Sequence, residues 1–111
     1  MTVTVRVFVP PKIIETAQTT QYNSSNATAI IDKFTATNFS AASVSVSVNL
    51  VTASTIAGNE NLIVKNRLLR PNETYLFPEL VGQVIMPGGF ISTLAGTASA
   101  VNIRVSGREI T

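Results

Sequence analysis

Carboxylates are the side chains in this sequence best suited to chemistry, because the chain has no cysteine and no histidine. Paired carboxylates can serve a glycosidase as acid and base, and clustered ones can hold calcium. The sequence places six of them, at Glu15, Asp32, Glu60, Glu73, Glu79 and Glu109. No two stand at the i, i+2 spacing of one strand face, and no calcium-loop pattern occurs, so only a pair assembled from different strands stays open. We therefore predict a non-enzymatic protein with no catalytic residue, no metal and no cofactor.

The basic residues are too scattered to predict a nucleic-acid-binding surface. Eight lysines and arginines give a net charge of +2 and an isoelectric point near 9.4. Only Lys65, Arg67 and Arg70 lie close together, whereas nucleic-acid binders cluster such residues among aromatic ones. The segment from Pro87 to Gly89 lacks the lysine and the following helix of a phosphate-binding loop. We expect no nucleic-acid partner.

The segment from Met1 to Val9 does not show the basic, apolar and small-residue pattern of a signal peptide, so we expect the product to stay in the cytosol where it is made. No apolar stretch approaches the roughly 20 residues that a membrane helix needs, and we predict no membrane partner. Four Asn-x-Ser/Thr sequences are interpreted as turn residues, at Asn23, Asn26, Asn38 and Asn72.

Regular alternation of apolar and polar residues predicts an all-β domain. It is strongest from Ser43 to Val51, and it recurs from Val3 to Val9 and from Val101 to Ser106. Weaker strands are expected at 19–23, 27–38, 62–69, 74–77, 82–86 and 90–95. Turn signals recur about every ten residues, the spacing of a sandwich. We predict a single domain over residues 1–111, folded as an antiparallel β-sandwich or jelly roll of about eight strands.

Asp32 interrupts the apolar face of the strand predicted over 27–38, on which Ile30, Phe34 and Ala36 share one side. Either a bulge after Ile30 and Ile31 turns Asp32 outward, or the carboxylate lies at the rim with a backbone partner. We favour the bulge.

Two further segments call for a choice between structures. Leu62 to Leu69 has some helical spacing, but it is short and closed by Pro71, so we predict a strand. Pro87 to Gly89 is expected to form a hairpin turn between the strands that flank it.

The N-terminal strand offers the candidate contact residues. Its valines, from Val3 to Val9, are expected to pack inside the sandwich, while Arg6 and Phe8 point outward and the prolines at 10 and 11 end the strand. A lone domain gains nothing by exposing a phenylalanine ring. We therefore predict that Arg6 and Phe8 contact another subunit or partner.

From Asn38 onward the sequence resembles a family of short tailed-bacteriophage virion proteins. The resemblance lies in Asn38 and Ser40 before the Val44, Val46, Val48 strand; Pro71 to Thr74; Leu80 to Ile85; Pro87 to Ser92; and Ala100 to Ile110. At the 87–89 turn this chain has Gly88 and Gly89 where such proteins often carry Gly-Asp. The resemblance implies a virion structural role, in capsid decoration or cement, in the neck or collar, or in a tail accessory.

These observations together predict a bacteriophage structural subunit that forms a homo-oligomer with itself and contacts other virion proteins such as capsid, neck or tail subunits. Only 13% of the residues are charged, so sheet edges and faces remain that would pair at random unless a specific partner covered them. The alternative is a carbohydrate-binding or adhesin-type module, which can use the same fold. Sugar binders usually present tryptophan or tyrosine platforms, and this chain has no tryptophan and two tyrosines.

Overall fold

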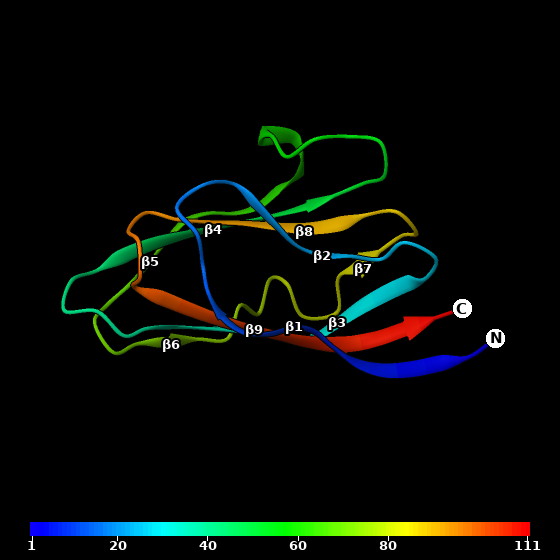
Figure 1. The fold of residues 1–111 in the computed structure, drawn as a ribbon, viewed down its shortest axis with the longest axis horizontal. Coiled ribbons are helices and arrows are strands. Elements are labelled where there is room, and N and C mark those ends of the chain that lie inside the picture. The colour runs from blue at the N-terminus through cyan, green and yellow to red at the C-terminus, as the bar shows by residue number, and fades with distance from the viewer.

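Two antiparallel sheets packed face to face make up the computed structural model, which describes residues 1–111 (Figure 1). The all-β prediction is confirmed, since one short 3-10 turn is the only helical element. No helix has the length and apolar character that crossing a membrane needs. The elements are β1 (Val3–Ile13), β2 (Thr19–Asn23), β3 (Thr28–Asn38), β4 (Val44–Val51), η1 (Asn59–Asn61), β5 (Leu62–Leu69), β6 (Thr74–Tyr75), β7 (Val84–Ile85), β8 (Phe90–Ala95) and β9 (Val101–Ile110).

The strand order is that of a jelly roll. Sheet A runs β1-β9-β3-β6, with β7 also paired to β3, and sheet B runs β2-β8-β4-β5. Because β6 and β7 pair with opposite ends of β3, they act as two halves of one edge strand. Counted that way, eight strands form two four-stranded sheets, the arrangement of a double-sheet jelly roll, and β4 and β5 are the only consecutive strands that pair within one sheet.

The core lies between the two sheets and comes from their inward-facing residues. Sheet B contributes Val44, Val46 and Val48, each at most 3% exposed, and β9 contributes a matching row of apolar residues. The connection from β6 to β7 folds back inward, so that Phe77 and Leu80 are fully buried. The Phe77 ring lies 4.9 Å from that of Phe34 on β3. This inward excursion closes the sandwich along the interrupted edge.

A bulge in β3 confirms the expected position of Asp32. The register against β9 shifts between Ile31 and Lys33, and Asp32 forms an ion pair of 2.9 Å with Arg108 on the outer side of sheet A. The bulge follows Ile31, so Ile31 is buried and Ile30 faces outward, half-buried, which corrects the predicted inward position of Ile30.

The N-terminal strand turns the opposite face to the core from the one predicted. Val3, Val5 and Val7 are 51%, 81% and 44% exposed, whereas Phe8 is only 6% exposed. A register shift between Val7 and Val9 adds a bulge at Phe8, and this allows both Phe8 and Val9 to be buried. The predicted exposure of Phe8 is therefore wrong.

Long-range partners explain why the Phe8 ring is inside. It stacks on Tyr22 of β2 with ring centroids 4.2 Å apart. It also lies over Gly107 of β9, where a Cβ atom would come within 2.6 Å of the ring. The missing side chain of Gly107 thus makes the room that the phenylalanine occupies.

Two predictions about chain boundaries in β1 and at 87–89 also change. β1 does not end at Pro10 and Pro11, because pairing with β9 resumes at Lys12 and Ile13. It is an edge strand, where proline is tolerated.

The 87–89 turn closes with a bond of 2.9 Å from the amide of Gly89 to the carbonyl of Met86, but it links β7 of sheet A to β8 of sheet B and is not a hairpin. The predicted strand over Leu62–Leu69 is confirmed.

Candidate functional site

The carboxylates are dispersed among different partners. No group of three or more aspartate or glutamate side chains is arranged to hold a metal ion. Glu15 pairs with Lys12 at 2.7 Å, and Asp32 pairs with Arg108. Glu79 accepts hydrogen bonds of 3.0 Å from the hydroxyl of Tyr75. Each of these groups thus has a local structural partner.

The two predicted contact residues, Arg6 and Phe8, belong to one cluster at the end of the sandwich. The guanidinium of Arg6 lies 3.3 Å from the carboxylate of Glu109, which also accepts a hydrogen bond from the hydroxyl of Tyr22. Burial raises the pKa of Tyr22 far above its ordinary value, and the hydrogen bond to Glu109 raises it further. The side chain of Arg6 remains 56% exposed and can reach a partner, whereas Phe8 is part of the core.

The valines opposite Phe8 instead belong to an exposed apolar area on the outside of sheet A. Strand pairing aligns Val5 with Arg108, Arg108 with Ile30, and Ile30 with Val84, so these four side chains share the outer face. We define the outer apolar patch as Val3, Val5, Val7, Ile30, Val84 and Ile110. It surrounds the ion pair between Arg108 and Asp32.

The sequence contains a signal for this patch, but the signal is ambiguous. Alternation identified Val3, Val5 and Val7 as one face of a strand, and it did not say whether that face meets the core or the solvent. The bulge and Gly107 decide that question, and both depend on the partner strand β9.

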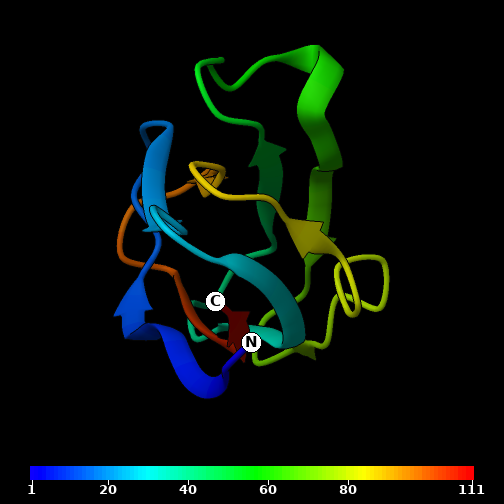
Figure 2. The same ribbon diagram turned by 90° about the vertical axis from the view of Figure 1, so that its right-hand side faces the viewer.

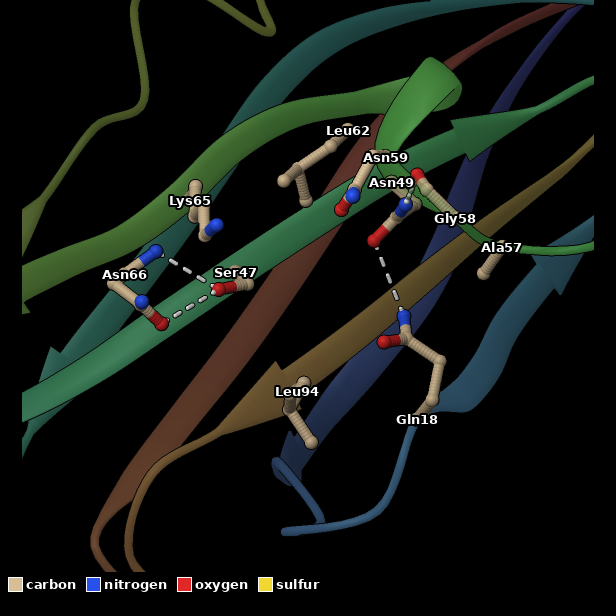
Figure 3. Close-up of a pocket in the computed structure, with 10 residues that line it drawn as sticks. All are labelled: Gln18, Ser47, Asn49, Ala57, Gly58, Asn59, Leu62, Lys65, Asn66 and Leu94. Carbon is tan, nitrogen blue, oxygen red and sulfur yellow. Dashed lines mark hydrogen bonds between the residues drawn. The ribbon is translucent and has the colours of Figure 1, made fainter.

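A second surface feature is a polar groove on the outside of sheet B (Figure 3). Its cavity has a volume of about 200 Å³ and lies between β4, β5, β8 and the loop 52–61, which projects beyond the sheets (Figure 2). Amides and a lysine line much of it, including Gln18, Asn49, Asn59, Lys65 and Asn66. None of its ten lining residues is aromatic, so a sugar ring would find no stacking platform there.

Amide side chains fasten the loop 52–61 onto sheet B. The Nδ2 of Asn49 donates to the carbonyl of Gly58 at 2.9 Å and to the Oδ1 of Asn61 at 2.7 Å. The Oδ1 of Asn49 in turn accepts a bond of 3.3 Å from Gln18. Asn49 is only 3% exposed, and no buried side-chain polar atom lacks a partner. The loop is therefore held by a satisfied network whose centre is Asn49.

Replacing Asn49 with alanine is expected to lower the free energy of unfolding by about 2 kcal/mol, because buried partners lose their hydrogen bonds. Urea unfolding measures the loss. Hydrogen exchange should show that the substitution accelerates the exchange of backbone amides more at residues 56–61 than elsewhere in the chain. The matched control is Asn59→Ala, since Asn59 lines the same groove, is exposed and makes no side-chain hydrogen bond. Equal effects of the two substitutions would contradict the role given to Asn49.

Comparisons with protein-family models, curated proteins and solved structures found no match. The surfaces of the domain itself therefore supply the basis for a functional proposal.

Proposed function

We propose that this chain is a non-enzymatic structural subunit of a tailed-bacteriophage virion, which forms a homo-oligomer and docks on the head, neck or tail. Viral capsid proteins, lectins and cupins all use the jelly roll, so the fold permits this role without selecting it. The sequence resemblance from Asn38 onward favours the virion among these classes.

The outer apolar patch is the observation that carries the proposal. Val5 and Val84 are 81% and 51% exposed, and apolar neighbours lie beside them in the register, Ile110 opposite Val3 and Ile30 opposite Val84, around the ion pair of Arg108 and Asp32. Contiguous apolar surface of this kind typically marks a site of protein contact. A subunit that is covered by neighbours in a particle accounts for it, since assembly would remove these side chains from water.

The carbohydrate-binding alternative has less support. Its best site would be the polar groove, whose amides suit sugar hydroxyls but which contains no aromatic ring. The two tyrosines are engaged elsewhere, Tyr22 against Phe8 and Tyr75 beneath the guanidinium of Arg67 at 4.1 Å.

An add-back experiment tests the proposal. Particles of the phage that encodes the chain are made without it, mixed with the purified protein and separated by sedimentation. We expect saturable binding, with at least about tenfold weaker binding by Val84→Lys, which would require burying a charge in the contact. Ile56→Lys is the control, because Ile56 is 84% exposed on the loop 52–61, outside the patch.

The result that would overturn the proposal is an absence of binding to particles. If the protein then bound members of a glycan array, and Lys65→Ala or Asn59→Ala in the polar groove reduced that binding, the carbohydrate alternative would take its place.

A further inference from the structure

β1 has a free edge whose backbone groups have no partner. The amides and carbonyls of Thr2 and Thr111 are bonded to each other in both directions, at 2.8 and 2.9 Å. In an antiparallel ladder, hydrogen-bonded pairs alternate with non-hydrogen-bonded pairs. Because Thr2 and Thr111 form a hydrogen-bonded pair, Thr4 and Arg6 also bond to their partners on β9. The N–H and C=O groups of Val3, Val5 and Val7 therefore point away from sheet A.

This part of the edge lacks the features that usually prevent strands from pairing with one another. Natural edge strands are protected by charges, prolines or coverage by another element. Between Val3 and Val7 the only charged residue is Arg6, and its side chain is held by Glu109 at 3.3 Å. Pro10 and Pro11 protect only the other half of the strand. Three exposed valines thus flank an open hydrogen-bonding edge.

We propose that two copies of this chain pair edge to edge through β1, antiparallel, with Val5 opposite Val5 of the second copy on a two-fold axis. This deepens the proposed function, because it names the surface through which the homo-oligomer forms. In that register Val3 lies opposite the second copy's Val7, so the three valines make one continuous apolar row. The two four-stranded halves join into a single sheet across the axis.

Charge placement agrees with this register. Arg6 would lie opposite Thr4 of the second copy, and Thr4 is aligned with Glu109 on β9. Each of the two rows in which Arg6 faces Thr4 then contains one cation and one carboxylate, and neither row brings like charges directly opposite each other. On the other face Arg108 flanks each Val5, and Asp32 balances its charge at 2.9 Å.

The proposed pairing also accounts for the exposed area of β1. Val3, Val5 and Val7 are 51%, 81% and 44% exposed, and their row continues into Ile110, Ile30 and Val84 on the same face. Stable interfaces bury roughly 800 Å² from each partner. Strand pairing would cover the backbone edge as well as the valine row, and so adds to the area supplied by the side chains alone.

Sedimentation velocity on the purified protein tests the association. The parent chain should be a dimer, and Val5→Pro should associate at least about tenfold more weakly, since it removes both bonds exchanged at the axis. The N–H of Val5 points away from β9, so this substitution leaves the β1–β9 ladder intact and circular dichroism should be unchanged. Val84→Lys, on the same face but away from the edge, should remain dimeric.

Cross-linking tests the register, because the chain contains no native cysteine. Val5→Cys should form a disulfide between copies under mild oxidation, since directly opposite residues lie within disulfide reach. Val3→Cys alone should not form this disulfide, whereas the double variant Val3→Cys, Val7→Cys should.

A parent chain that is monomeric or trimeric, a Val5→Pro variant that dimerises as strongly as the parent, or cross-linking by Val3→Cys alone would overturn the pairing. These assays use no particles, so their failure is distinct from a failure to bind the virion.

Discussion

Replacing Phe8 with alanine is expected to destabilise the domain by about 3 to 5 kcal/mol, the range for removing a buried aromatic side chain. The ring is 6% exposed and stacks on Tyr22, so its loss leaves a cavity between β1, β2 and β9. Urea unfolding followed by circular dichroism measures the change.

Phe39→Ala provides the matched control for Phe8. Phe39 is 48% exposed and stacks on no other ring, so its replacement should change the stability by less than about 1 kcal/mol. A Phe8→Ala variant as stable as Phe39→Ala would place the Phe8 ring outside the core, as the valine alternation first suggested.

The substitution Gly107→Ala should have an effect of similar size for the opposite reason, excess volume. A Cβ atom at this position would lie 2.0 Å from the carbonyl oxygen of Ile30 and 2.6 Å from the Phe8 ring. Since a backbone carbonyl in a paired strand cannot move aside freely, we expect a loss of about 3 kcal/mol or more, at the upper end of overpacking effects.

Gly58→Ala is the corresponding control, because no atom lies within 4 Å of its added Cβ and its φ of −164° is ordinary extended backbone. Thermal unfolding should separate the two variants clearly. Equal melting temperatures for Gly107→Ala and Gly58→Ala would contradict the close approach of β1 and β3 to β9 at Gly107.

The positions of the strands could be predicted from sequence because alternation and turn residues are local signals. The strand at Leu62–Leu69 follows from a segment that is short and closed by Pro71, and the bulge at Asp32 follows from one carboxylate that interrupts an apolar face. The all-β class follows in the same way, since the period of two recurs along nearly the whole chain.

The direction in which β1 faces could not be predicted, because it is decided by residues about 100 positions away. Val3, Val5 and Val7 form as good an inward face as any in the sequence. The Phe8 ring is buried instead, because Gly107 leaves room for it and the bulge at Phe8 turns it toward the core. The outer apolar patch, and with it the candidate contact surface, therefore depends on the pairing of β1, β9, β3 and β7.

The polar groove escaped prediction for a related reason. Ser47 and Asn49 occupy the polar positions of the clearest alternating strand, and such positions normally face water. They are 7% and 3% exposed because Asn66 of the neighbouring strand β5 donates its backbone amide to the hydroxyl of Ser47, and the loop 52–61 returns over Asn49. Local alternation carries no information about which loop will return over a sheet.

The most direct test of the proposed virion role is electron cryomicroscopy of particles made with and without this chain, at a resolution that resolves strands. We predict density for the 1–111 jelly roll in the first sample only, placed so that a neighbouring subunit covers the outer apolar patch. Identical reconstructions of the two particles would contradict a structural role in the virion. Density that left the patch facing solvent would contradict the contact surface assigned to sheet A.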